Sequence, residues 1–166
     1  MAMTEDDVLA VVDVLEERAI PVSVAGGWAV DALVGRVTRE HGDLDLAIDT
    51  TLVDRAIGVL GRIGLHLDLD ERPARLALGD GRRAVDLHPV AWGSDGTGIQ
   101  DGLAGERFIY PPGSTYAAGR ICGRTVRCLT PELLIAFHLG YEPRPIDRQD
   151  MAALARQFDL ELPPPY

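Results

Sequence analysis

Two aspartates stand one residue apart in the segment 42–46, which reads Gly-Asp-Leu-Asp-Leu. Because successive side chains of a β-strand point to opposite faces, Asp43 and Asp45 lie on one face and the two leucines on the other. Two carboxylates on one side of a strand repel each other unless a cation lies between them. This spacing predicts a site for divalent cations.

A pair of glycines, Gly26 and Gly27, follows an apolar run and begins a helical pattern. A polyphosphate can approach a backbone that has no Cβ, and the N–H groups at the start of a helix favour anions. A third acid, Asp86, lies in a later strand pattern and shares a face with His88. Together these features predict a magnesium-nucleotide site, in which a two-metal centre draws on all three acids.

Three motifs in order carry a resemblance to a known family. They are Gly-Gly-Trp-x-x-Asp-x-Leu-x-Gly from Gly26, Arg-x-His-x-Asp-x-Asp from Arg39, and Asp-x-His-Pro from Asp86. In these motifs the chain resembles the lincosamide nucleotidyltransferases and is similar to the aminoglycoside 2″-nucleotidyltransferases, both of the polymerase-β-like nucleotidyltransferase superfamily. Residues 137–141 and 147–150 match the lincosamide branch, so the resemblance covers almost the whole chain.

The resemblance implies an α+β fold, with a mixed twisted sheet flanked by helices and a small C-terminal helical part. We expect a nucleotidyltransferase core over residues 1–104, and C-terminal strands and helices over residues 105–166 that complete the substrate cleft. The implied activity is transfer of AMP from ATP to a hydroxyl of a small antibiotic, with release of pyrophosphate. A lincosamide is the first candidate acceptor and an aminoglycoside the second.

The resemblance makes Asp43, Asp45 and Asp86 the catalytic and metal-binding residues. They would hold Mg²⁺, as two ions that bridge the nucleotide phosphates, and Asp86 would accept the proton of the attacking hydroxyl. The residues expected to bind the nucleotide are Gly26, Gly27, Arg36, Arg39 and His41. For both arginines a solvated surface position is the alternative, and for His41 the alternative is a structural hydrogen bond.

The residues expected to bind the acceptor are His88, Tyr141, Arg144 and Asp147. His88 could orient Asp86, contact the substrate or be structural, and Tyr141 could stack on a base or pack between the last two helices. Trp28 and Asp31 lie on the helix after the glycine turn. Trp28 could be a core residue and Asp31 a helix cap or arginine partner.

The chain has 166 residues, a net charge of −10, and 16 arginines but no lysine. This balance argues against a nucleic acid partner, which needs basic surface, and suits a small cationic antibiotic. The lack of lysine excludes a Walker A loop and Schiff-base chemistry. Without a run of ~20 apolar residues or a basic leader, we expect a cytoplasmic protein with no membrane partner and with reduced cysteines. A homodimer stays open.

The periodic patterns predict alternating helices and strands along the chain. We expect helices over 4–18, 26–35, 51–60, 130–140 and 147–158, strands over 22–25, 43–48, 66–70, 75–78, 84–90 and 107–110, a hairpin over 121–129, and a loop over 93–105. Two rival functions remain: a nucleotidyltransferase with a protein acceptor, as in an antitoxin that silences a toxin, and a non-catalytic nucleotide-binding module.

Overall fold

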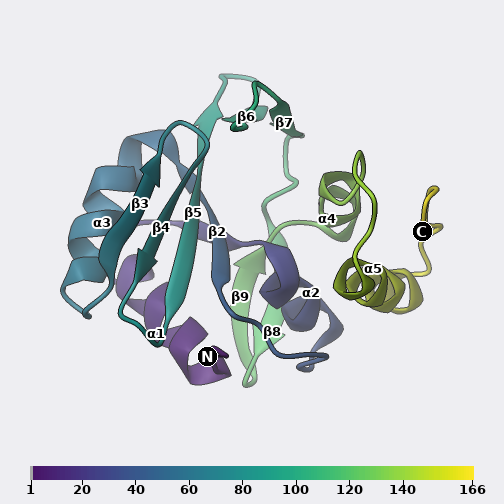
Figure 1. Ribbon diagram of the computed structural model, residues 1–166, viewed down its shortest axis with the longest axis horizontal. Helices are drawn as coiled ribbons and strands as arrows, with labels where there is room; N and C mark the ends of the chain where they lie inside the picture. The colour runs from purple at the N-terminus through teal and green to yellow at the C-terminus, as the bar shows by residue number, and fades with distance from the viewer. Residues whose placement is uncertain (1) are drawn as a thin grey trace.

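The computed structural model describes residues 2–166, and Figure 1 shows a twisted sheet with helices on both sides. The helices are α1 (Glu5–Glu16), α2 (Gly26–Val34), α3 (Val53–Gly61), α4 (Pro131–Phe137) and α5 (Pro145–Phe158), with a short 3-10 turn, η1, at Thr50–Leu52. The strands are β1 (Val22–Val24), β2 (Leu44–Asp49), β3 (His66–Glu71), β4 (Arg75–Gly79), β5 (Ala84–Trp92), β6 (Gly98–Asp101), β7 (Arg107–Tyr110), β8 (Ala117–Ile121) and β9 (Arg124–Cys128). The predicted α+β class is confirmed.

The sheet is mixed, and its order over the described residues is β3-β4-β5-β2-β1-β9-β8. Strands β2 and β5 run parallel, as do β1 and β9, whereas the remaining pairs are antiparallel. The β6–β7 hairpin pairs with the end of β5 and projects from one end of the sheet (Figure 1). The parallel β2–β5 pair, at the centre of this order, places Asp45 beside Asp86.

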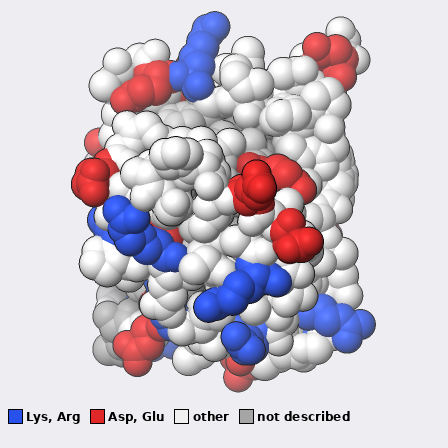
Figure 2. Space-filling model, turned by 90° about the vertical axis from the view of Figure 1, so that its right-hand side faces the viewer, with Lys and Arg blue, Asp and Glu red and all other residues white. Residues whose placement is uncertain are grey.

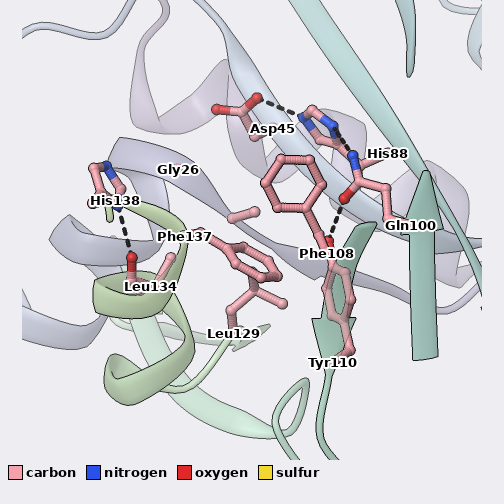
Figure 3. Close-up of a pocket in the computed structure, with 11 residues that line it drawn as sticks. Gly26, Asp45, His88, Gln100, Phe108, Tyr110, Leu129, Leu134, Phe137 and His138 are labelled. Carbon is pink, nitrogen blue, oxygen red and sulfur yellow. Dashed lines mark hydrogen bonds and ion pairs between the residues drawn. The ribbon is translucent and has the colours of Figure 1, made fainter. Parts of the chain in front are cut away.

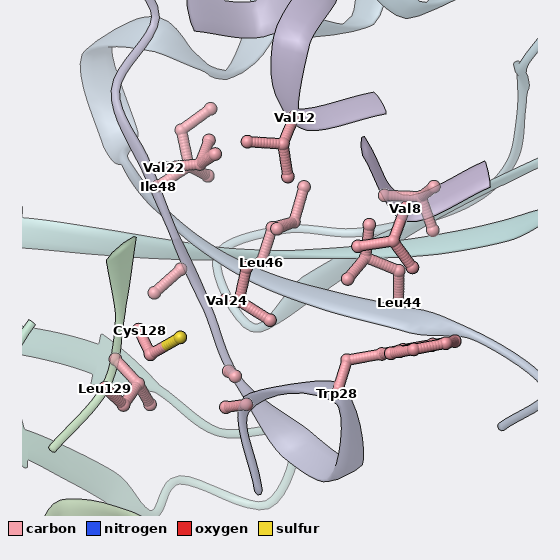
Figure 4. Close-up of a cluster of buried hydrophobic side chains, with 14 of the residues drawn as sticks. Val8, Val12, Val22, Val24, Trp28, Leu44, Leu46, Ile48, Cys128 and Leu129 are labelled. Atoms are coloured by element: carbon pink, nitrogen blue, oxygen red, sulfur yellow. The ribbon is translucent and has the colours of Figure 1, made fainter. Parts of the chain in front are cut away.

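The alternation of β2 divides the sheet into a core face and a polar face. Leu44, Leu46 and Ile48 are fully buried on one face. In Figure 4, Val8 and Val12 of α1 lie beside these strand residues. A capping box begins α1, because Thr4 and Asp7 exchange side-chain and backbone hydrogen bonds. The acidic residues of β2 are thereby left on the opposite face.

Four local predictions were wrong in detail. The segment predicted as a loop contains β6, a strand too short for its alternation to be recognised. Helix α3 begins at Val53 rather than at residue 51, because Asp49 caps the η1 turn before it and its carboxylate accepts a hydrogen bond from the Thr51 N–H at 2.7 Å. Helix α4 ends at Phe137 rather than Gly140, and α5 begins at Pro145, two residues earlier than predicted.

The division of the chain after residue 104 stays a prediction. In the structure this point falls between the paired strands β6 and β7. Strand β9 pairs with β1, so residues of the second segment complete the sheet of the first. Helices α4 and α5 lie together at one end of the molecule with the C-terminus (Figure 1).

Two smaller expectations concern cysteines and membranes. Cys122 and Cys128 are both free thiols, as predicted. Within residues 2–166, no helix combines the length and the apolar character needed to cross a bilayer. On the face shown in Figure 2, acidic and arginine side chains are interspersed and do not form a single basic patch.

Candidate active site

Two of the predicted acids lie side by side on the polar face of the sheet. Asp45 of β2 and Asp86 of β5 are register partners in the parallel pair, and Asp43 comes just before β2. Burial and the nearby Asp45 carboxylate raise the pKa of Asp86, and the same two causes raise the pKa of Asp43. The three acids therefore crowd negative charge at one place, which favours a cation there.

The donor set at this place consists of carboxylate oxygens, the ligands that hard divalent cations prefer. Within residues 2–166, no three His, Cys, Asp or Glu side chains form a ready-made metal cluster. Mg²⁺ is held in many enzymes by one or two carboxylates together with substrate phosphates, rather than by an all-protein cage. Carboxylate oxygens on Asp43, Asp45 and Asp86 match that mode of binding.

The Gly26 turn brings the start of α2 against Asp45. The Ala25 N–H donates to the Asp45 carbonyl at 2.9 Å, and α2 begins at the next residue. Gly26 has a φ of 56°, and a Cβ at this position would overlap the Asp45 carboxylate. The N–H groups of the first turn of a helix have no partner within the helix, and Gly26 and Gly27 both line a cavity that Asp45 also lines. Glycine is thus required here for both conformation and space.

His41 and Asp31 form a buried pair that shapes the segment before β2. The His41 Nε2 lies 2.5 Å from an Asp31 carboxylate oxygen, and both residues are almost fully buried. The second Asp31 oxygen accepts hydrogen bonds from the Thr38 N–H and hydroxyl, so Asp31 is neither a helix cap nor an arginine partner. Trp28 is a core residue whose ring packs 4.7 Å from the His41 ring. His41 is therefore held by a structural hydrogen bond, although its other ring edge lies beside Gly27.

The first residues of α5 close the cavity that begins at the Gly26 turn. Arg39 donates to Asp150 at 2.7 Å, and Arg144 donates to Asp147 at 2.8 Å. Burial favours a raised pKa for Asp147, but hydrogen bonds from Arg144 outweigh it and lower the pKa of Asp147. The resulting cavity of about 350 Å³ is lined by Gly26, Gly27, Arg39, His41, Gly42, Asp43, Asp45, His138, Arg144, Ile146, Asp147 and Asp150. Eight of the twelve predicted residues are brought together here.

Four predicted residues lie outside this lining: Asp86 and His88 lie beside Asp45, whereas Arg36 and Tyr141 do not. Arg36 is exposed beyond the C-terminal end of α2, the end away from the Gly26 turn. Tyr141 is 42% exposed and does not line this cavity. Burial and the Asp147 carboxylate raise the pKa of Tyr141 to about 12, so its phenol stays neutral at physiological pH. Neither residue lines the cavity, although Tyr141 lies close enough to Asp147 for that carboxylate to act on its phenol. Nucleotide binding by Arg36 and acceptor binding by Tyr141 stay predictions.

A second cavity of about 200 Å³ opens on the other side of Asp45 (Figure 3). Its polar rim includes His88, whose Nε2 lies 2.9 Å from Asp45 Oδ1; His88 thus contacts Asp45 rather than Asp86. The rest of its lining consists of Ala25, Gly26, Gln100, Phe108, Tyr110, Leu129, Leu134, Phe137 and His138. The cavity is therefore an apolar, aromatic-lined space that meets a carboxylate.

Sequence reasoning missed four residues of this lining: Gln100, Phe108, Phe137 and His138. His138 borders both cavities, and in Figure 3 it lies across the pocket from Asp45. Its Nδ1 lies 2.7 Å from the Leu134 carbonyl, which can only accept, so Nδ1 carries the hydrogen. The signal that could have found His138 is its place in the 137–141 motif, near the end of a predicted helix.

Comparison with known proteins identifies the family. Residues 7–154 match the model of the aminoglycoside-2''-adenylyltransferases, and the chain belongs to this family. It is 27% identical over 153 residues to a lincosamide resistance protein of Staphylococcus haemolyticus, covering 92% of this chain and 94% of that protein. It is 31% identical over 136 residues to a 2''-aminoglycoside nucleotidyltransferase of Escherichia coli, covering 80% and 72% respectively.

Solved structures agree with this assignment. The chain matches the lincosamide antibiotic adenylyltransferase LnuA, determined with lincomycin bound, with a TM-score of 0.81 and 26% identity over 93% of this chain and 98% of that one. It matches ANT(2")-Ia in complex with adenylyl-2"-tobramycin with a TM-score of 0.71 and 25% identity over 92% and 87%. The predicted resemblance, fold and enzyme class are confirmed: the chain is a nucleotidyltransferase.

Proposed function

We propose that the protein transfers AMP from ATP to a hydroxyl of a small cationic antibiotic and releases pyrophosphate, with a lincosamide as first acceptor and an aminoglycoside as second. The observation that carries the proposal is the pairing of Asp45 and Asp86 in register on parallel strands, beside the first turn of α2. A lincosamide comes first because the relative of that name is matched over 94% of its length, and because the second cavity is apolar.

The nucleotide would occupy the cavity beside Gly26 and Gly27. Gly26 and Gly27 of the first turn of α2 line this space, and the N-terminal end of a helix favours phosphate. Arg39 and Arg144 line the same cavity and carry the positive charge that triphosphate oxygens need. Both guanidiniums already pair with carboxylates of α5, so they are held in place for a phosphate before it arrives.

Mg²⁺, as two ions, would be held by Asp43, Asp45 and Asp86 together with phosphate oxygens. When bound, magnesium neutralises charge on the transferred phosphoryl group and on the pyrophosphate that leaves. The burial and crowding of these carboxylates support the assignment, since burial and the Asp45 charge raise the pKa of Asp43 and of Asp86 and make a cation favourable.

Asp86 would act as the general base. The acceptor hydroxyl oxygen forms a bond to the α-phosphorus, the bond from that phosphorus to the bridging oxygen breaks, and the hydroxyl proton passes to Asp86. A raised carboxylate pKa makes Asp86 a stronger base than an exposed aspartate, and its side chain is only 15% exposed. Arg75, 3.4 Å from Asp86, partly offsets this rise in the pKa of Asp86.

A pyrophosphate-release assay tests the proposal. ATP, Mg²⁺ and the folded protein are incubated with lincomycin, clindamycin or a panel of aminoglycosides, and the adenylylated product is identified by mass spectrometry. Turnover with a lincosamide is the expected result, and turnover with aminoglycosides alone would move the acceptor to the second candidate. If the protein binds Mg·ATP but releases no pyrophosphate with any of these acceptors, the antibiotic assignment is refuted.

A further inference from the structure

We propose that Gln100, a residue outside every predicted motif, is a positioning residue that holds Asp45 through His88. A chain of hydrogen bonds connects them across three strands (Figure 3). His88 Nε2 lies 2.9 Å from Asp45 Oδ1, and His88 Nδ1 lies 3.1 Å from Gln100 Nε2. Gln100 Nε2 also lies 3.2 Å from the Ala74 carbonyl, and Gln100 Oε1 lies 2.7 Å from the Tyr110 hydroxyl.

The Ala74 carbonyl determines the direction of the other bonds in the chain. A carbonyl can only accept, so the NH₂ end of the Gln100 amide must face Ala74. The second hydrogen of that NH₂ group then goes to His88 Nδ1, which accepts it. In the neutral imidazole the other nitrogen carries the ring hydrogen, and His88 therefore donates from Nε2 to Asp45.

Burial makes this chain a fixed part of the structure. Gln100 is 9% exposed and Tyr110 is 2% exposed, so neither side chain can exchange its partners for water without opening the hairpin. The Tyr110 hydroxyl donates to Gln100 Oε1, and the whole amide is thereby paired. The His88 ring cannot turn about its side-chain bond without losing the hydrogen bond at Nδ1.

The chain selects which oxygen of Asp45 is free. Oδ1 accepts the hydrogen bond from His88, whereas Oδ2 faces Gly26, the side on which the nucleotide cavity begins. Partners behind a ligating group orient it, and their loss typically weakens metal affinity or activity ~10–100-fold. The consequence for catalysis rests on the proposed function, because it assumes that Oδ2 binds a cation beside the phosphates.

Nuclear magnetic resonance of ¹⁵N-histidine-labelled protein tests the bond without substrate or metal. The chain has four histidines, and the His88 signal is assigned by its loss in His88→Asn. We expect a slowly exchanging proton on Nε2 and none on Nδ1 in the wild type. In Gln100→Met the ring loses its second anchor and the Nε2 proton exchanges rapidly, whereas in Tyr110→Phe it persists because Ala74 still orients the amide.

Gln157→Met is the matched control, since Gln157 is exposed near the end of α5. The proposal is overturned if the His88 Nε2 proton exchanges as slowly in Gln100→Met as in the wild type. It is also overturned if His88 of the wild type carries its hydrogen on Nδ1. If Gln100→Met does not fold, Gln100→Asn replaces it, because its amide is one methylene too short to reach both partners.

A second measurement links the bond to the site. Electron paramagnetic resonance titration with Mn²⁺ and ATP should give roughly tenfold weaker Mn²⁺ binding in Gln100→Met and no change in Gln157→Met. Equal Mn²⁺ affinity in wild type and Gln100→Met overturns the positioning role. Failure of every acceptor in the turnover assay refutes the proposed function instead, since neither measurement here depends on an acceptor.

Discussion

Replacing Gly26 with alanine should separate the catalytic role of the first turn of α2 from its role in folding. Gly26 has a φ of 56°, in the left-handed region, and a Cβ there would overlap the Asp45 carboxylate. Gly35, at the other end of the same helix, has a φ of 79°, and a Cβ there would meet nothing within 4 Å. The pair Gly26→Ala and Gly35→Ala therefore shares backbone strain but not the collision.

The expected magnitudes differ accordingly. A left-handed conformation costs an alanine about 1–2 kcal/mol in either position. For a chain of this size, ~1 kcal/mol lowers Tm by about 2–4 °C, so each variant should lose roughly 2–8 °C. Only Gly26→Ala must also push the Asp45 carboxylate aside, and a displacement of about 1 Å at a reacting centre can lower kcat ~100-fold.

The assay combines thermal denaturation with pyrophosphate release at saturating ATP and acceptor. The kcat is expressed per mole of folded protein. Comparable losses in Tm, with a loss of kcat confined to Gly26→Ala, are the expected pattern. Equal kcat for the two variants would refute the reasoning, because the Asp45 carboxylate would then tolerate a Cβ against it. A loss of kcat in Gly35→Ala would show that strain in α2 alone disturbs the site.

Four further predictions concern charge and metal. Asp86→Asn should lower kcat roughly 10²–10⁴-fold by steady-state kinetics. It should also raise Tm in the presence of a chelator, because burial and Asp45 raise the pKa of Asp86, so its ionised form opposes folding above that pKa. With the chelator present, the same shift predicts that the free energy of unfolding of the wild type falls as pH rises through the raised Asp86 pKa, and equal pH profiles for wild type and Asp86→Asn would contradict it. Arg39→Ala leaves the buried Asp150 carboxylate unpaired and should cost about 1–3 kcal/mol in denaturant unfolding. The exposed Arg36→Ala control should stay within about 0.5 kcal/mol, and equal effects would contradict the pairing. Chelation of divalent ions should abolish turnover without unfolding, and added Mg²⁺ should restore it.

The parts of the site that could be predicted are those encoded by short-range patterns. Alternation along β2 places Asp43 and Asp45 on the face opposite the buried leucines, and the glycine pair marks the start of α2. The partners of these residues come from distant segments and left no local pattern. Arg39 meets Asp150 only because α5 packs against α2, so its role as an ion-pair partner depends on tertiary structure.

Gln100 illustrates why the rest of the site escaped sequence reasoning. In β6 the apolar Ile99 is the more exposed residue and the polar Gln100 is buried, the reverse of the usual strand pattern. Pairing of β6 with β7 puts Gln100 opposite Phe108 and on the same face as Tyr110, and so beside His88. An amide is stable in that position only when every polar atom finds a partner, and those partners come from three other segments. Burial of a polar residue against the local pattern is therefore the mark of a functional contact here, visible only once the hairpin is in place.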